Sequence, residues 1–165
     1  MILGFTGTRN GMNDFQKRVL QETIQNFGDA LLEAVHGDCM GADTEFHQMI
    51  RSLTRARLVL RPGIGARDGK NETRAFNEAD VVLPVGTFFS RNRDIVDACD
   101  FLVGAPLNGF RKGGTWQTLR YAHKKRKPGL IIFPDRTAAI EEYFLGVEAA
   151  DRLTDTRRRR GGNVL

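Results

Sequence analysis

The fold is decided by the N-terminal stretch MILGFTGTRNGMNDFQKRVLQETIQNF (residues 1–27). Its first part, residues 1–7, is mostly apolar and ends at a glycine, which is typical of a buried strand. Apolar residues then recur at helical spacing from Phe15 to Phe27, and Asn13 is placed to cap this helix. A buried strand, a glycine-containing loop and an amphipathic helix, in this order, predict the first unit of a parallel α/β fold.

The same alternation of apolar runs and helical patterns continues along the chain. Further buried strands are expected near residues 31–37, 57–61, 101–106 and 129–133. Near-continuous apolar strands separated by helices indicate a parallel sheet that is covered on both faces. We therefore predict an α/β fold, a Rossmann-like three-layer sandwich with a mostly parallel five-stranded sheet.

Residues 63–90 form the least regular part of the sequence. They are rich in glycine, asparagine, arginine and acidic residues, and their one apolar patch, Val81–Val85, is interrupted by Pro84. A proline at this place argues against a central strand. Long loops inside compact domains are usually functional or disordered. No strand is therefore expected in this segment.

Length and composition indicate one soluble domain. The chain has 165 residues, of which 41% are hydrophobic and 27% charged, which excludes a wholly disordered or fibrous protein. We expect a single domain over residues 1–150, closed by a helix over 137–150, and a basic, flexible tail over 151–165. The N-terminus lacks the features of a signal peptide, and no apolar run approaches the ~20 residues of a membrane span. Reduced cysteines and a cytoplasmic location are expected.

The net charge of +5 is unevenly distributed. Residues 111–127 carry seven lysines and arginines and no acidic residue, and Arg157–Arg160 add four more positive charges. The rest of the chain is therefore acidic. Such a concentration of positive charge suits an anionic ligand, although a solvated helix face with a disordered tail would give the same pattern.

Ligands of open parallel sheets bind beyond the carboxyl ends of the strands, so the loops there are the places to search. The first such loop contains Gly7, Thr8 and Arg9. Glycine permits close approach of a phosphate to the backbone, threonine offers a hydroxyl, and arginine offers two parallel donors. The motif is neither a dinucleotide-binding fingerprint nor a Walker loop, and an ordinary turn is the alternative.

The second loop is HGDCMGAD (36–43), which contains Gly37, Asp38 and Asp43. Its glycines permit a tight turn into a helix, where Asp43 suits the first turn. Asp43 and His47 also stand four residues apart, as two metal ligands on one helix face would. No third ligand follows at a suitable spacing, so we predict no metal site.

The third loop is KGGTWQT (112–118). The pair Gly113–Gly114 opens a helix and leaves unpaired N–H groups for an anion, with Thr115 and Thr118 close by. A fourth feature, Arg91 and Asn92 near the start of another helix, could clamp a phosphate or stack on a base. A plain helix start is the alternative interpretation in both cases.

These four stretches, in this order, resemble the SLOG superfamily. They read GFTGTR (4–9), HGDCMGAD (36–43), RNRDIVDACDFLVGAP (91–106) and GGTWQTLRYAHKKRKP (113–128). This superfamily includes the LOG phosphoribohydrolases, once called lysine-decarboxylase-like proteins, the molybdenum-cofactor carrier proteins and the DNA-processing protein A family. The resemblance extends over about residues 1–134 and is greatest to small stand-alone phage and bacterial members.

The resemblance implies a pocket for a nucleotide or a nucleotide-derived phosphorylated molecule. The residues expected to converge on it are Gly7, Thr8, Arg9, Gly37, Asp38, Asp43, Arg91, Asn92, Gly113, Gly114, Thr115 and Thr118. Arg91 matches the arginine of enzymatic members. The glutamate of their P-G-G-x-G-T-x-x-E loop is replaced by Thr118, and loss of an acid–base group costs roughly 10²–10⁴-fold in rate.

Three functions remain open at this stage. The first, which the missing glutamate favours, is a sensor, carrier or sequestering protein for a nucleotide-derived molecule. The second is a phosphoribohydrolase or another nucleotide-processing enzyme, in which Asp38, Asp43 or Glu78 would replace the glutamate. The third is a nucleic-acid-binding accessory protein that uses the basic segments. We expect no cofactor and no membrane partner, and a homo-oligomer, because related folds commonly dimerise.

Overall fold

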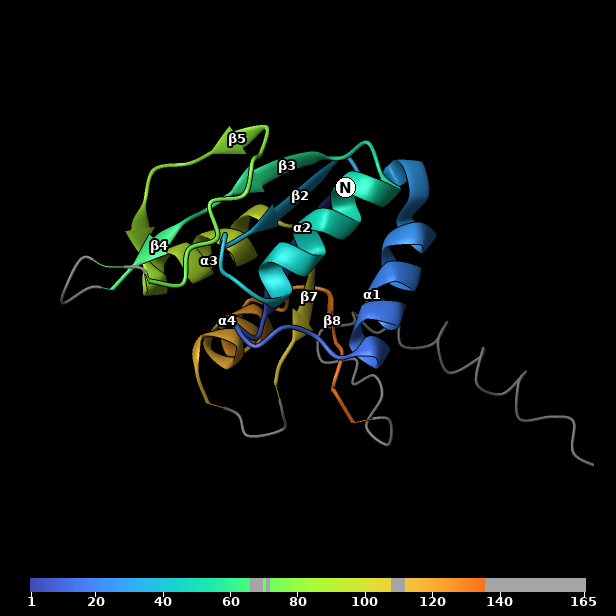
Figure 1. The fold of residues 1–165 in the computed structure, drawn as a ribbon. Helices are drawn as coiled ribbons and strands as arrows, with labels where there is room; N and C mark the ends of the chain where they lie inside the picture. Colours follow the sequence, from blue (N-terminus) through green and yellow to red (C-terminus); the bar gives the residue numbers. More distant parts are fainter. Residues whose placement is uncertain (66–69, 71, 108–111, 136–165) are drawn as a thin grey trace, which may run out of the picture.

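The computed structural model describes residues 1–65, 70, 72–107 and 112–135, and its fold is shown in Figure 1. Six strands form the central sheet. In chain order they are β1 (Ile2–Gly7), β2 (Glu33–His36), β3 (Arg57–Leu60), β5 (Val81–Val82), β7 (Phe101–Ala105) and β8 (Gly129–Ile131). Their order across the sheet is β5-β3-β2-β1-β7-β8, and every neighbouring pair is parallel. The predicted Rossmann-like α/β sandwich is confirmed.

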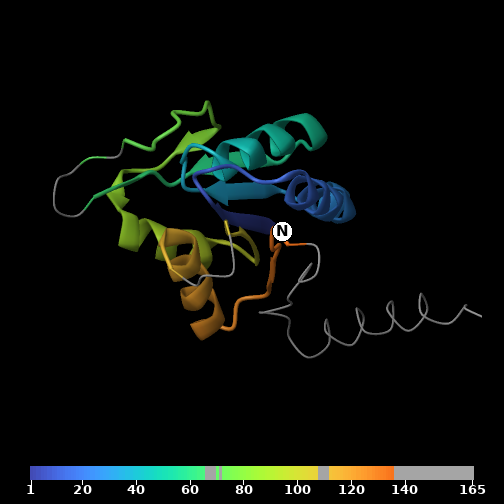
Figure 2. The ribbon, with the colours of Figure 1, turned by 60° about the horizontal axis from the view of Figure 1, so that its bottom comes forward.

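Four α-helices of the described residues cover the two faces of this sheet (Figure 2). They are α1 (Asp14–Phe27), α2 (Ala42–Leu53), α3 (Phe88–Ala98) and α4 (Gly114–Lys124). Helices α1 and α2 bury their apolar faces against one side, where Phe46 stacks on Phe5 with ring centroids 4.5 Å apart. Helices α3 and α4 cover the other side, where Ile95 and Leu119 are buried. Each face therefore has its own hydrophobic core.

The expected count of five strands is wrong by one. Val81 and Val82 pair with Val59 and Leu60 of β3 and so add a short edge strand, β5. Pro84 follows this strand instead of interrupting it, and an edge is where a neighbouring proline is tolerated. A second, two-stranded sheet joins β4 (Gly63–Ile64) to β6 (Gly86–Thr87), which was also not expected. The expected helix over 137–150 and the tail over 151–165 lie outside the described residues.

Two glycines and a capping residue set the positions of the helices. Asn13 caps α1, as the sequence predicts, and the structure adds a reciprocal capping box with Gln16. A Cβ atom on Gly104 of β7 would lie 2.5 Å from Leu119 Cδ2, so glycine is what allows α4 to pack this closely on the sheet. A Cβ atom on Gly4 would lie 2.7 Å from Cys99 Sγ, at the end of α3.

None of the described helices combines the length and the apolar character that crossing a membrane requires.

Gln16 ties α1 to two other parts of the molecule. Its buried side-chain Nε2 donates to the carbonyl oxygens of Pro106, at 2.9 Å, and Ile132, at 2.8 Å. These residues follow β7 and β8 directly, so the amide group fixes the chain where it leaves the two strands. Buried carbonyl groups that lose a donor cost stability, because water does not reach them.

We expect Gln16→Leu to lower the free energy of unfolding by about 2–4 kcal/mol, because two carbonyl groups each lose a donor worth roughly 1–2 kcal/mol. Urea unfolding followed by circular dichroism measures this. The matched control is Gln21→Leu on the exposed side of the same helix. Equal stability of the two variants would contradict the structural role given to Gln16.

Candidate functional site

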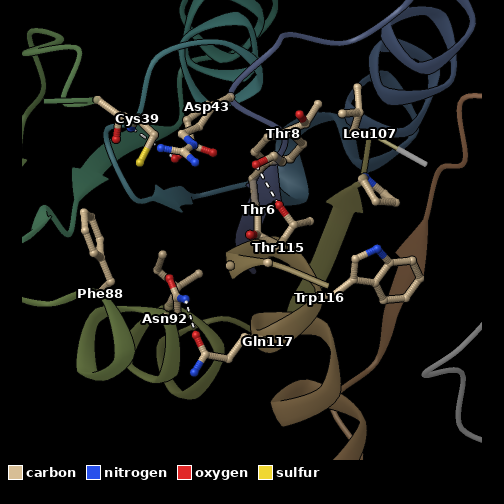
Figure 3. A pocket seen from close by; sticks show the side chains of 18 of the residues that line it. Thr6, Thr8, Cys39, Asp43, Phe88, Asn92, Leu107, Thr115, Trp116 and Gln117 are labelled. Atoms are coloured by element: carbon tan, nitrogen blue, oxygen red, sulfur yellow. Dashed lines mark hydrogen bonds between the residues drawn. The ribbon is translucent and has the colours of Figure 1, made fainter. Parts of the chain in front are cut away.

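A cavity of about 620 Å³ opens where β1 and β7 end and where α4 begins. Figure 3 shows how the lining residues are arranged along the cavity. Cys39 and Phe88 lie on one side, Thr115 and Thr8 near the middle, and Trp116 and Leu107 on the other side. This is the position at which parallel sheets bind ligands, beyond the carboxyl ends of their strands. The volume lies within the range of small-molecule sites.

The start of α4 forms the middle of the cavity wall. Gly113 has a φ of +89°, a backbone conformation that favours glycine, and the helix begins at Gly114. No side chain among the described residues caps this helix, so its first N–H groups are left for a ligand or water. Thr115 instead uses its hydroxyl to donate to the Gly7 carbonyl oxygen, at 2.8 Å. This bond holds the helix start beside the end of β1.

The loop after β1 is fixed by its own backbone. Thr8 N–H donates to the Ala105 carbonyl oxygen at 3.0 Å, and the Thr8 carbonyl oxygen accepts from Ala42 N–H at 3.0 Å. The Thr8 hydroxyl accepts from Asn10 N–H at 3.2 Å. Three elements, β7, α2 and the loop itself, therefore hold Thr8 in place. Arg9, the next residue, lines the cavity and adds positive charge.

Arg91 lies in a slot made by two glycines. A Cβ atom on Gly37 would lie 1.2 Å from Arg91 Nη1, and one on Gly63 would lie 3.3 Å from its Nε. Gly37 does not have a positive φ, so the space for Arg91, and not backbone conformation, explains glycine there. The arginine reaches the cavity wall through this slot with only 8% of its surface exposed.

The buried guanidinium of Arg91 has few partners. Its Nη1 and Nη2 lie 3.8 and 3.6 Å from the Cys39 sulfur, and its Nε has no hydrogen-bond acceptor in the described part of the chain. Within the described ranges no carboxylate comes within ion-pair distance of it. A cation that is removed from water and left without a carboxylate costs several kcal/mol. An anionic ligand in the cavity would offset this cost.

Asp43 is an acidic side chain close enough to this cation for the two charges to interact. It lies at the start of α2, is only 5% exposed, and accepts a hydrogen bond from Cys39 N–H at 3.2 Å. Burial raises the pKa of Asp43 to about 6, although the charge of Arg91 acts in the opposite direction. Burial dominates because the carboxylate loses its hydration.

His36 and His47 form a buried pair behind Asp43. His36 Nδ1 accepts from Asp38 N–H at 3.1 Å, so the proton of this ring is on Nε2, which donates to His47 Nδ1 at 3.0 Å. Burial and the nearby positive charges lower the pKa of His36 to about 3, so the ring is neutral. The 4.0 Å approach of His36 Nδ1 to Asp43 Oδ2 is therefore not an ion pair.

The chain matches no known protein family and no curated protein sequence. Two solved structures share its fold. The molybdenum cofactor binding protein of the phototrophic bacterium Rippkaea orientalis superimposes with a TM-score of 0.60 at 14% identity, covering 93% of this chain and 84% of that one. DNA processing protein A from Helicobacter pylori superimposes with a TM-score of 0.58 at 16% identity, covering 97% of this chain and 81% of that one. This chain therefore shares one fold with both proteins.

In this fold, most of the residues predicted for the site come together. Nine of them line the cavity: Gly7, Thr8, Arg9, Asp43, Arg91, Asn92, Gly113, Gly114 and Thr115. They come from the end of β1 and the loop after it, from α2 and α3, and from the start of α4 with the preceding Gly113. The first and the last of them, Gly7 and Thr115, are 108 residues apart in sequence. That these residues bind a ligand stays a prediction.

The other three predicted residues do not line the cavity. Gly37 lies beside it and makes room for Arg91. Asp38 is fully buried, and its carboxylate accepts from Arg74 Nε at 2.9 Å and from the backbone and side-chain nitrogens of Asn77, both at 3.0 Å. Thr118 is also fully buried, and its hydroxyl donates to the Gly114 carbonyl oxygen at 3.0 Å. Asp38 therefore anchors the segment around Arg74–Asn77, and Thr118 stabilises α4.

Sequence reasoning missed several residues of the cavity wall. Cys39 and Gln117 stand inside recognised motifs but carry no distinctive signal there. Thr73 and Phe88 lie in the irregular segment 63–90, in which no sequence pattern singled them out. Thr73 is brought to the cavity by the hydrogen bond from Met40 N–H to its carbonyl oxygen, at 2.7 Å. Contacts of this kind are set by tertiary structure and leave no periodicity in the sequence.

We expect Asp43→Asn to raise the free energy of unfolding at pH 7.5. The folded-state pKa of about 6 lies above the unfolded value of 3.8, so ionised Asp43 costs up to about 3 kcal/mol above pH 6. This cost disappears as the pH falls through 6 towards 4. Urea unfolding of both proteins between pH 4 and 8 measures it, with Asp94→Asn, an exposed carboxylate on α3, as the control. A gain in the free energy of unfolding that is independent of pH would contradict the raised pKa of Asp43.

Proposed function

We propose that the protein binds a phosphorylated nucleoside derivative in this cavity and acts as its sensor, carrier or sequestering protein. The proposal rests mainly on the position of Arg91, a buried cation in the cavity wall. The start of α4, which no described side chain caps, lies in the same wall. Two independent features, a side-chain charge and a helix N-terminus, favour a negatively charged ligand at the same place.

The charge of the cavity wall supports an anionic ligand. The described residues that line it include three cations, Arg9, Arg91 and Lys112, and one carboxyl group, Asp43. Hydrogen bonds to charged groups contribute about 1.5–3 kcal/mol each. Several of them, after the entropic cost of association, would support micromolar affinity. Apolar residues such as Leu107 and Phe88 offer surfaces for a sugar or a base.

The two proteins of similar fold support a binding role but differ in what they bind. One is described as a molybdenum cofactor binding protein, and the other as a protein that binds single-stranded DNA. A cavity with a buried cation in its wall favours a small molecule for this chain, since single-stranded nucleic acids are usually bound along positively charged grooves that carry a series of stacking aromatic side chains.

Efficient hydrolysis of ordinary nucleotides is not expected. Thr118, which stands where enzymatic members of the superfamily carry a glutamate, is buried and bonded to the Gly114 carbonyl oxygen. Of the three carboxylates considered as replacements, Asp38 is bonded to Arg74 and Asn77, and Glu78 does not line the cavity. Asp43 does line it.

The position of Asp43 in the cavity wall therefore favours a second candidate function, N-glycosidic hydrolysis. With a pKa near 6, its carboxyl group could donate a proton to a leaving base and accept one from water. In that case base release would depend on Asp43 and would be lost in Asp43→Asn. We place this candidate second, because burial beside Arg91 and a bond from Cys39 N–H also suit a purely structural carboxylate.

Calorimetry with a panel of nucleoside 5′-monophosphates, together with a base-release assay on the same preparation, tests the proposal. We expect micromolar binding without base release, and a loss of affinity of about 10–100-fold in Arg91→Ala, because a charged donor is removed. Arg93→Ala, two residues further along α3 and exposed, is the matched control and should bind normally. Rapid base release would make the enzyme interpretation correct.

Cys39 offers a second, independent measure of binding. Its half-buried thiol lines the cavity, whereas Cys99 is buried in the core between α3 and the sheet. Because burial raises the pKa of Cys39, alkylation should be slow and best followed near pH 8.5. We expect a bound nucleotide to slow alkylation of Cys39 at least fivefold. Unchanged alkylation at a saturating nucleotide concentration would place the ligand elsewhere.

A further inference from the structure

The two anion-attracting features of the cavity lie over different strands. Thr115 fixes the start of α4 over Gly7, at the end of β1. Arg91 Nη1 lies where a Cβ atom of Gly37 would be, just after the end of β2. Adjacent strands are about 4.8 Å apart. The cavity therefore has two positions for negative charge, side by side along the carboxyl edge of the sheet.

Figure 3 shows the same separation in the arrangement of side chains. Cys39, whose sulfur lies 3.6 Å from Arg91 Nη2, is on one side of the cavity, and Thr115 lies towards its middle. Leu107 and Trp116 lie on the far side of Thr115. The cavity, at about 620 Å³, is much larger than one phosphate group requires. An apolar end, a helix start and a buried cation thus follow one another along it.

We propose that the cavity takes a nucleotide with two linked phosphoryl groups, a nucleoside diphosphate or a derivative of one. The first phosphate lies on the N–H groups that begin α4, the second on the guanidinium of Arg91, and the nucleoside lies towards Leu107. This assignment rests on the proposed function and adds the class of ligand to it. It explains why the chain maintains a buried arginine whose Nε finds no acceptor among the residues that the structure describes.

The slot around Arg91 supports this assignment. Gly37 and Gly63 hold the guanidinium beside Cys39, a partner that is polarisable and carries no full charge as a thiol. Among the described residues no carboxylate forms an ion pair with it, although the charge of Asp43 lies close enough to interact with the guanidinium, so its N–H groups remain available to a ligand. The second phosphate would meet a desolvated, preorganised cation, which is the arrangement that makes a charged hydrogen bond strong.

The test compares the affinities of AMP with ADP, and of GMP with GDP, at one salt concentration by calorimetry. The proteins are the wild type, Arg91→Gln, Gly37→Ala and the control Arg93→Gln. A Cβ atom at position 37 displaces the flexible end of Arg91 without removing its charge, so Gly37→Ala tests the position of the guanidinium separately. Circular dichroism confirms that each variant is folded.

We expect the diphosphates to bind at least tenfold more tightly than the monophosphates to the wild type and to Arg93→Gln. In Arg91→Gln and Gly37→Ala this ratio should fall to about two or less. Equal affinities for mono- and diphosphates in the wild type would overturn the two-phosphate assignment while leaving the proposed function intact, and so would an unchanged ratio in Arg91→Gln. Failure of all four nucleotides to bind would overturn both.

Discussion

The guanidinium of Arg91 lies in the protein interior without a carboxylate partner among the described residues, and the surrounding structure has to accommodate its charge. The cost of burying such a charge amounts to several kcal/mol. Glycines at positions 37 and 63 provide the space, the Cys39 sulfur provides a soft contact, and Asp43 provides a field that favours the cation. A chain selected for stability alone would place an apolar side chain here, so the arrangement favours a role in binding.

The rest of the fold determines where this charge is presented. Strand β1 lies between β2 and β7 near the middle of the sheet, and its end carries Gly7 and Thr8. Helix α4 approaches that end closely because Gly104 has no side chain, and Thr115 then bonds to Gly7. The short β4–β6 sheet holds the beginning of α3, from which Arg91 extends. Contacts of Gly104, Gly7 and the β4–β6 sheet thus place the helix start and the arginine over neighbouring strands.

The sequence predicts the sheet and the helices well because their signals are local. Apolar runs such as those of β1 and β7 and the capping box at Asn13 are visible in a few consecutive residues. The edge strand β5 was missed because its two residues are too few to show a pattern and Pro84 follows closely. Asp38, predicted for the site, instead binds Arg74 and Asn77, since a carboxylate after a strand serves an anchoring role equally well. The role of Gly37 could not be predicted, because it depends on an arginine more than fifty positions away.

The central claim is that the start of α4 and Arg91 together receive a phosphorylated ligand, and an NMR titration tests it most directly. Heteronuclear spectra of the labelled protein resolve the backbone N–H groups of Gly114 and Thr115 and the side-chain Nε–H of Arg91. On addition of ADP, these three signals should shift together, with one common dissociation constant. They should do so at lower ADP concentrations than the signals of residues on the exposed face of α4. Shifts confined to exposed lysines such as Lys124, with Gly114, Thr115 and Arg91 unchanged, would contradict the account.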